Sequence, residues 1–381
     1  MWFLQGDTLC GIALIVLAAV VLRQLQKVVP KLPVNVLIPV LEVLLLGYVG
    51  LKLAVFYALY TAVGLGFCAI LFRIQKGRRF LFVLFCLLSL VPFLLSRFPY
   101  QGIDAAFVVF TVGIAFQMLK MIDALFYVYY AELAVRPLVY VNYMLFIPVF
   151  TSGPIFRYRD FIATYDNPTP LTWELAEDCT KRVILGFFKK LVLSQLAVKA
   201  LALLSGMEPR WYLSVGTVVL SYLVLYFDLS GYSDIAIGFG RFCGYQVPEN
   251  FKNPLDAATF TQFWRKWHAT LSDWIREHVY VVVSKKKLGR LQSGLIAFMT
   301  MILMGLWHGF TVPYLISALY LAVLLMLENF LGLTTLNKRK ANPVHYWLRC
   351  ILTNFLFALN TLVFTLPADK VISTLLGFVR L

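Results

Sequence analysis

Two of the four histidines stand where an imidazole could act as a base. His308 closes an apolar run that begins near Leu295, and it lies between Gly305 and Gly309. A titratable side chain in an apolar segment costs desolvation, so it marks a functional site by default. With a pKa of about 6.5, imidazole can remove a proton from a hydroxyl near neutral pH, and the glycines would allow a backbone or a ligand to approach closely. A packing histidine bonded to a neighbouring carbonyl fits the spacing equally well.

His268 closes a string of aromatic and basic residues. Trp264 and Trp267 are three residues apart, so a helix would place both indoles on one face, with His268 four residues beyond Trp264. An interfacial aromatic belt with a polar anchor explains the same spacing, and composition alone favours it. His278 and His345 stand in a charged stretch and a loop context and receive no role.

Other chemistries lack their motifs. The sequence has no HExxH, and its six cysteines are scattered without a CxxC pair, so neither a metal site nor a disulfide framework is predicted. A GxSxG nucleophile elbow and phosphate-binding loops of the GxxxxGK[ST] and GxGxxG types are missing as well. A Ser-His-Asp triad stays open, because residue counts do not test it.

Composition requires these side chains to be carried by membrane helices. Of the 381 residues, 61% are hydrophobic and 14% are charged, whereas soluble domains are about 45–50% apolar and about 25% charged. The net charge of +15 comes largely from short basic clusters between apolar runs. This distribution indicates cytoplasmic loops and anionic lipid rather than nucleic acid. The clusters are 73–79, 181–190, 285–287 and 338–340.

We therefore predict an all-α, multi-pass protein of the plasma membrane. At about 20 residues per crossing, residues 1–381 form one integral domain of about ten or eleven transmembrane helices. Basic residues follow the first apolar run instead of preceding it, which indicates an uncleaved membrane helix. The polar, aromatic stretch 246–292 predicts short re-entrant or amphipathic helices. The expected apolar segments are 9–22, 34–51, 53–72, 80–96, 105–130, 138–150, 183–204, 211–228, 231–244, 293–307, 311–333 and 346–366.

Acidic residues inside apolar segments allow a second class of function. Lys120 and Asp123 are three residues apart and could pair on one helix face. Asp228 and Asp234 flank a stretch of small and hydroxyl residues that interrupts the apolar pattern. Broken helices with buried carboxylates are used by ion-coupled carriers, and a polar reaction chamber would use them too. Both alternatives remain open, with Asp123 and Asp234 as the coupling groups of a carrier. A membrane scaffold would leave the grouping of His, Trp, Arg and Asp unexplained.

A series of strings in one order decides between these classes. Together they cover residues from about 143 to 330 and resemble the membrane-bound O-acyltransferase (MBOAT) family, in its bacterial polysaccharide-acylating branch. The earlier part of the chain agrees in hydropathy and spacing only. The strings are Phe150–Tyr158, Asp228–Gly238, Pro248–Phe251, Phe263–His268, Leu271–Arg276 and Met304–Gly309.

Within this branch two subfamilies compete. The strings at Phe150 and Met304, together with the modest length, resemble teichoic acid D-alanyltransferases, whereas Gly231–Gly238 resembles alginate O-acetyltransferases at least as well. The short separation of His268 and His308, and the Ser-Lys-Lys-Lys string in place of a Leu-Gly-Gly type string, favour the D-alanyl branch.

The resemblance implies a ring of membrane helices around a central funnel, with His308 catalytic and His268 in the same chamber. It implies no permanently bound cofactor. The donor would be a thioester on phosphopantetheine, carried by a small acidic carrier protein at the basic cytoplasmic face or by coenzyme A. The acceptor would be a hydroxyl of an envelope polymer. Further substrate-tunnel candidates are Trp264, Trp267, Trp307, Asp234, Ser233, Asn250 and Arg265.

Overall fold

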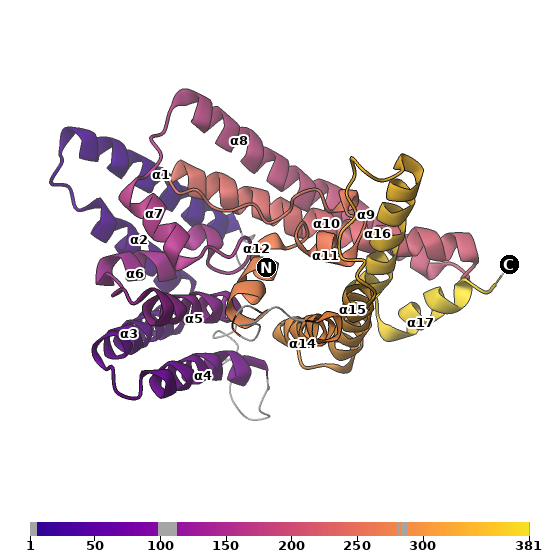
Figure 1. The fold of residues 1–381 in the computed structure, drawn as a ribbon. Coiled ribbons are helices and arrows are strands. Elements are labelled where there is room, and N and C mark those ends of the chain that lie inside the picture. Colours follow the sequence, from indigo (N-terminus) through magenta and orange to yellow (C-terminus); the bar gives the residue numbers. More distant parts are fainter. Residues whose placement is uncertain (1–5, 98–112, 281, 283–288, 381) are drawn as a thin grey trace. The chain divides into compact units, whose positions relative to one another are not determined.

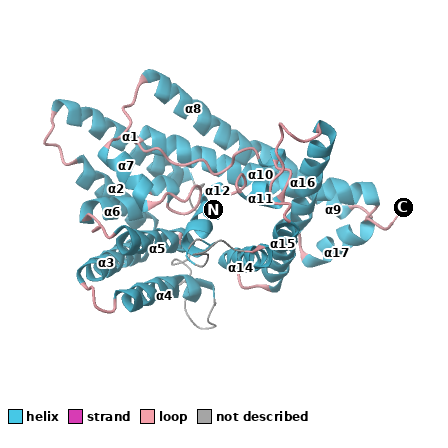
Figure 2. Cartoon of the chain, in the orientation of Figure 1, coloured by secondary structure: helices cyan, strands magenta, loops and turns pink. Residues whose placement is uncertain are grey.

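Every regular element in the described part of the chain is a helix. The computed structural model describes residues 6–97, 113–280, 282 and 289–380, and within them only helices and loops occur (Figures 1 and 2). The all-α prediction is confirmed. The lysine cluster 285–287 and the start of the expected segment 105–130 lie outside the described residues.

Contacts between Cα atoms divide the chain into two compact units. The first comprises Met1–Val183 and Ala236–Pro248, and the second comprises Ile184–Ile235 and Glu249–Leu381. Two of the three unit boundaries fall inside helices, α8 (Trp173–Phe187) and α10 (Trp211–Phe242), and the third falls in the loop after α10.

Unit 1 contains the first seven helices and most of α8. Its other helical elements are α1 (Gly6–Val28), α2 (Val34–Val49), α3 (Leu51–Arg73), α4 (Arg78–Arg97), α5 (Ile114–Ala131), α6 (Pro137–Leu145), the 3₁₀ turn η3 (Ile147–Val149) and α7 (Tyr158–Asp166).

Unit 2 contains most of α10 and the C-terminal helices. Its other elements are the π-helix η4 (Phe188–Leu193), α9 (Ser194–Gly206), the 3₁₀ turn η5 (Pro254–Asp256), α11 (Phe260–Trp264), α12 (Ala269–Ile275), the π-helix η6 (Arg276–Tyr280), α14 (Arg290–His308), α15 (Val312–Leu331), α16 (Pro343–Thr365) and α17 (Ala368–Gly377).

The long helices are built for a bilayer. Seven helices among the described residues, α1, α3, α4, α10, α14, α15 and α16, are long and apolar enough to cross a membrane. Only 22% to 39% of each apolar window is buried, so most of its side chains need lipid as a solvent. The chain is therefore a multi-pass membrane protein.

The described residues contain seven such helices where ten or eleven were predicted, because several apolar segments are broken or merged. The expected segment 138–150 is the nine-residue helix α6 followed by a 3₁₀ turn and irregular chain. The segment 183–204 is interrupted by the π-helix η4. The segments 211–228 and 231–244 run together as the 32-residue helix α10.

Ion pairs explain why α10 is not broken at its two aspartates. Lys189 Nζ lies 2.7 Å from Asp234 Oδ2, and Lys190 Nζ donates to Asp228 Oδ1. Successive lysines reach the same helix because they lie in the wide turn of η4. A paired carboxylate is tolerated inside an apolar helix, whereas an isolated one is costly.

A close backbone approach brings these lysines within reach. A Cβ atom built on Gly186 would lie 2.7 Å from the carbonyl oxygen of Gly231, and one built on Gly231 would lie 2.7 Å from the carbonyl oxygen of Gly186. Only glycine at both positions permits this contact.

In unit 1, buried polar side chains satisfy an irregular backbone. Pro148, Gly153 and Pro154 prevent helix between α6 and α7, so the peptide groups there lack helical partners. Side chains of α2 and α5 replace these partners. Glu42 Oε1 accepts from Ile147 N at 3.1 Å, and Gln117 Nε2 donates to Phe150 O at 3.1 Å.

Lys120 and Asp123 do not pair with each other as predicted, because each bonds to another part of unit 1. Lys120 Nζ donates to Tyr143 O at 3.0 Å. Asp123 Oδ2 accepts from Tyr158 N at 2.6 Å and from the Tyr143 hydroxyl at 3.3 Å. Each charge holds the ends of the irregular segment instead, because unsatisfied backbone groups are costly in lipid.

We predict that Asp123→Leu destabilises the protein by about 1–3 kcal/mol, because Tyr158 N and the Tyr143 hydroxyl lose their buried acceptor. Asp123→Asn keeps one acceptor oxygen and should cost less. Thermal unfolding of purified protein in detergent measures the difference. As a control, Asp166→Leu removes only an exposed partner of Arg136 and should shift stability little. Equal melting temperatures for Asp123→Leu and the control would contradict this role.

Candidate active site

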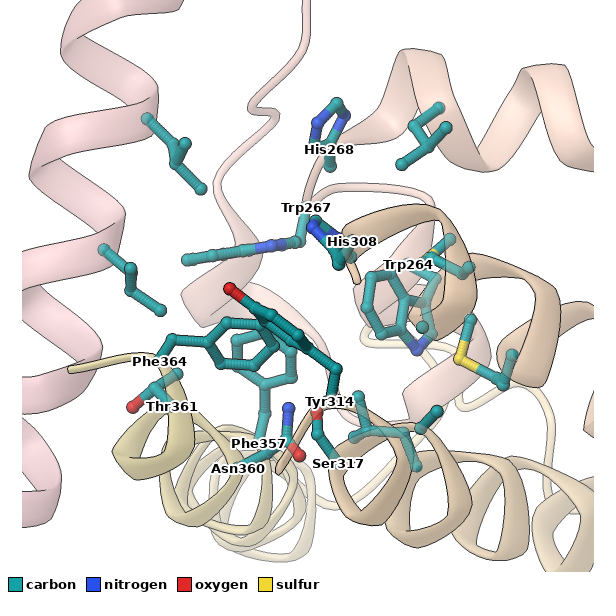
Figure 3. Close-up of a pocket in the computed structure, with 18 residues that line it drawn as sticks. Trp264, Trp267, His268, His308, Tyr314, Ser317, Phe357, Asn360, Thr361 and Phe364 are labelled. Atoms are coloured by element: carbon teal, nitrogen blue, oxygen red, sulfur yellow. The ribbon is translucent and has the colours of Figure 1, made fainter. Parts of the chain in front are cut away.

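A cavity of about 200 Å³ opens inside unit 2, lined by the long helices α10, α14, α15 and α16, by the short helices α11 and α12, and by the irregular chain between α11 and α12. His268 and His308 both line it, and Figure 3 shows them at one end of the cavity above the aromatic side chains. The other lining residues are Leu225, Leu229, Trp264, Trp267, Leu271, Met301, Met304, Gly305, Tyr314, Ser317, Ala318, Leu321, Phe357, Asn360, Thr361 and Phe364.

The hairpin of α14 and α15 positions His308. A Cβ atom on Gly305 would lie 2.2 Å from Ala318 Cβ, and one on Gly309 would lie 2.4 Å from Tyr314 Cδ2. The two glycines beside His308 therefore admit α15 itself, rather than a ligand. As a result the imidazole packs near the rings of Tyr314 and Phe364, with centroids 6.5 and 5.9 Å away.

His268 is held in an unusual backbone conformation. Its φ of 46° lies in the left-handed region, which is uncommon for residues other than glycine. The residue stands immediately before α12, and its carbonyl accepts from Leu271 N at 3.0 Å and Ser272 N at 3.1 Å. Because of this turn, Trp264, Trp267 and His268 do not belong to one helix, as the spacing predicted. Their side chains instead line the same cavity.

Asn250 fixes that turn. Its side-chain oxygen accepts from the Thr270 hydroxyl at 2.7 Å and from Thr270 N at 3.3 Å, while its amide donates to Ser233 Oγ at 3.2 Å. Its main-chain oxygen accepts from Ala269 N at 2.9 Å. Asn250 and Ser233 were predicted as tunnel candidates, but these contacts make them supports behind His268, and neither lines the cavity.

Two further contacts hold the segment that carries Trp264. Glu328 Oε2, on α15, accepts from Thr261 N at 2.9 Å and so caps the start of α11. Trp267 is buried and stacks on Phe263 with a centroid distance of 5.7 Å. The aromatic string therefore serves two purposes, since Trp267 anchors the segment while Trp264 remains beside the cavity.

Two polar atoms beside the histidine pair have no partner among the described residues. His268 Nδ1 and Trp264 Nε1 are buried and form no hydrogen bond there. Buried polar atoms are normally satisfied, and each exception asks for an explanation. Both side chains line the cavity, so a bound molecule would supply their partners.

Burial, together with the neighbouring His308, lowers the pKa of His268 to about 3. Burial acts in this direction because it disfavours the charged imidazolium. His268 is consequently neutral at physiological pH, with one ring nitrogen able to donate and the other able to accept.

The other predicted tunnel residues, Arg265, Trp307 and Asp234, do not line this cavity. Arg265 lines an adjoining, more polar cavity of about 300 Å³, which shares Trp264, Met301 and Met304 with the first. Trp307 contacts both imidazoles, with its ring centroid 6.3 Å from that of His268 and 4.9 Å from that of His308. Asp234 is engaged by Lys189, as described above.

Sequence reasoning missed the contribution of α15 and α16. Tyr314, Ser317, Asn360, Thr361 and Phe364 line the cavity, yet none belongs to a recognised string. The polar pair Asn360-Thr361 inside an apolar helix was an available signal, because polar residues in membrane helices usually face the protein interior. Among the described residues, no three His, Cys, Asp or Glu side chains group as a metal site would require.

The site combines two imidazoles with two buried polar atoms that have no partner among the described residues. These features define the class of multi-pass membrane proteins whose apolar cavity can accept or donate a proton. The family follows from comparison. The chain belongs to the membrane-bound O-acyltransferase family, whose model matches residues 37–365. This confirms the resemblance and extends it well beyond residues 143–330.

Relatives come from both subfamilies. The chain is 34% identical over 265 residues to a probable alginate O-acetylase of Pseudomonas fluorescens, covering 68% of this chain and 50% of that protein. It is 33% identical over 260 residues to the corresponding protein of Pseudomonas putida, covering 66% and 52%. It is 30% identical over 220 residues to the teichoic acid D-alanyltransferase of Bacillus subtilis, covering 54% and 53%. The chain thus spans about half the length of these relatives.

We predict that Asn250→Leu frees His268 from its turn. The substitution removes the acceptor of Thr270 and the donor to Ser233, so the left-handed backbone at His268 loses its support. Diethylpyrocarbonate labelling of His268, followed by mass spectrometry, should become several-fold faster. Ser233→Ala removes only one of the contacts of Asn250, together with the bond from the Ser233 hydroxyl to Leu229 O. It is the matched control, for which labelling should change less. Unchanged labelling in Asn250→Leu would contradict the positioning role.

Proposed function

We propose that this protein transfers a small acyl group from a thioester to a hydroxyl of a cell-envelope polysaccharide. The observation that carries the proposal is the convergence of His308 and His268 on one apolar cavity beside unpartnered donors. Family membership supports the reaction class. The names of the relatives support an envelope polymer as acceptor.

In the proposed step, a ring nitrogen of His308 accepts the proton of the acceptor hydroxyl as its oxygen attacks the thioester carbonyl. The carbon–oxygen bond forms and the carbonyl oxygen becomes an oxyanion. When the intermediate collapses, the carbon–sulfur bond breaks and the thiolate takes the proton from the His308 imidazolium. The products are an ester and a free thiol. A general base of this kind contributes about 10²–10⁴-fold.

His268 and Trp264 would stabilise the oxyanion. The indole Nε1–H of Trp264 is a donor, and a neutral His268 has one N–H to donate. Both polar atoms lack partners among the described residues, so they need not give up a bond when charge develops on the substrate. A single donor of this type is worth about 10²–10³-fold. The adjoining cavity with Arg265 would hold the polar part of a substrate.

For the acyl group, the cavity lining favours an uncharged acetyl group. Among the described residues that line it, none is an aspartate or glutamate that could neutralise the ammonium of a D-alanyl group. The relatives named as alginate O-acetylases also match more of the chain. On these observations we take acetyl as the first candidate, whereas the strings at Phe150 and Met304 favour the D-alanyl branch.

A D-alanyl group is the second candidate. The aromatic faces of Trp264, Trp267 and Tyr314 could hold an ammonium by cation–π contact, and a D-alanyltransferase is among the relatives. An ion-coupled carrier is less well supported, because Asp123 holds Tyr158 N and Asp234 pairs with Lys189.

The donor would reach the protein on a phosphopantetheine thioester. A small acidic carrier protein suits the net charge of +15 and the basic clusters, since complementary charge steers association. At 338–340 one member of the cluster, Lys338, is already placed over the Trp347 ring at 4.8 Å, which leaves Arg339 and Lys340 as the exposed contacts for such a carrier.

We predict that His308→Ala abolishes acylation while leaving the protein folded. Mild alkali releases ester-linked groups from the envelope polymers of cells, and the released acids identify the acyl group. Acetate lost in His308→Ala supports the first candidate, and D-alanine lost supports the second. His345→Ala, at the exposed start of α16, is the matched control and should acylate normally. Wild-type ester content in His308→Ala would refute the proposal.

We also predict that His268→Gln lowers the rate without moving its pH dependence. His268 has a pKa of about 3 and is neutral above pH 5, so its removal changes no charge near His308. The pH at which thioester consumption is half-maximal, measured by thiol release from purified protein, should stay at the wild-type value. A shifted midpoint would show that His268 itself titrates during the reaction.

A further inference from the structure

A cavity in unit 1, separate from the histidine site, has the features of an anion site. It measures about 250 Å³ and lies at the C-terminal end of α1. Its lining residues are Val20, Arg23, Gln24, Gln26, Lys27, Pro168, Thr169, Pro170, Leu171, Phe242 and Gly244. The list includes two cations and no carboxylate.

Arg23 has an unsatisfied hydrogen-bond donor. Its guanidinium lies over the Tyr245 ring, 5.1 Å from the centroid. Its Nε atom is buried and forms no hydrogen bond with the described residues. Lys27 stands four residues later, one turn along the same face of α1. An arginine fork with an adjacent lysine matches the oxygens of a phosphate.

The wall opposite Arg23 is preformed. Thr169 N donates to Gly244 O at 3.0 Å, and Gln246 Nε2 donates to Thr169 Oγ1 at 3.3 Å. Gly244 has a φ of 81°, and a Cβ atom there would lie 3.1 Å from Arg23 Nη1. Glycine therefore satisfies the left-handed backbone and also keeps the space beside the guanidinium open.

A lipid-facing apolar stripe runs along another face of α1. Five large apolar side chains, spaced by three and four residues, are each at least 47% exposed. They would contact acyl chains of the bilayer on a face of α1 turned away from Arg23 and Lys27, because residues one or two positions apart do not share a helix face. The members of the stripe are Leu14, Leu17, Val21, Leu25 and Val28.

The charges place this end of α1 at the inner surface of the membrane. The connection from α1 to α2 carries Lys31, close to Lys27 at the end of α1. The connection from α3 to α4 carries Lys76, and Arg79 follows in the first turn of α4. Figure 1 shows both connections at the same edge of unit 1 (left in the view). Basic connections of this kind face the cytoplasm, where anionic lipids attract them.

We propose that this cavity binds the headgroup phosphate of an anionic phospholipid at the inner surface of the membrane. Arg23 and Lys27 hold the phosphate, and the Pro168–Leu171 segment forms the wall. A free phosphate would use the same cations, but the basic connections place the cavity at the membrane surface, where anionic headgroups gather, so the lipid is the proposed occupant. The proposal is independent of the acyl-transfer function.

The test is native mass spectrometry of the purified full-length protein in detergent with added phosphatidylglycerol or phosphatidylcholine. The wild type should retain phosphatidylglycerol in preference to phosphatidylcholine. Arg23→Gln combined with Lys27→Gln should weaken phosphatidylglycerol retention by about tenfold, because each cation near the membrane surface contributes to attraction of anionic lipid. Arg23→Lys keeps the charge but loses the fork and should lie between them.

The matched control combines Lys76→Gln with Arg79→Gln, which removes two exposed charges at the same edge of unit 1. It should retain phosphatidylglycerol like the wild type. Equal retention by Arg23→Gln/Lys27→Gln and the wild type would overturn the proposal, as would equal loss in the control. Displacement of the lipid by millimolar inorganic phosphate would show that the site binds free phosphate instead. Melting temperatures verify that each variant is folded. If the double variant unfolds, the test rests on Arg23→Lys, which should retain less phosphatidylglycerol than the wild type.

Discussion

Irregular backbone inside an apolar environment needs hydrogen-bond partners, and this requirement governs the arrangement of the protein. A helix satisfies its own peptide groups, but the segments around Pro148 and before His268 do not. Each buried peptide group left without a partner would cost about 1–3 kcal/mol. The chain answers with buried polar side chains on neighbouring helices. In unit 1 these are Glu42, Gln117, Lys120 and Asp123.

The same solution recurs in unit 2, where it has a consequence for the site. Asn250 and Glu328 satisfy the backbone on either side of the Trp264–His268 segment. Because the main chain is satisfied by these supports, the Trp264 indole and the His268 imidazole are not consumed by the fold. Their polar atoms remain unpartnered among the described residues. The supports behind the cavity thus leave these polar atoms able to bond a molecule bound in it.

Charges that looked functional in the sequence are largely structural. Lys120 and Asp123 are engaged with the main chain, and Lys189 and Lys190 neutralise Asp234 and Asp228 on α10. Glycines that looked like ligand contacts serve helix packing, as Gly305 does against Ala318. In both cases the residue type was informative about burial, but its partner depended on which helix lies opposite. A single chain pattern does not contain that information.

The sequence by itself determined the helical membrane class, the family, and the two histidines as candidates, because hydropathy and ordered strings are local properties. It also located Trp264, Trp267 and Arg265 near His268 in the chain. Only the tertiary structure decided that Tyr314, Asn360 and Phe364 complete the cavity, and that Asn250 and Ser233 stand behind it. The physical reason is that a cavity forms where faces of distant helices meet. Helical periodicity describes each face, whereas close packing between helices selects which faces meet.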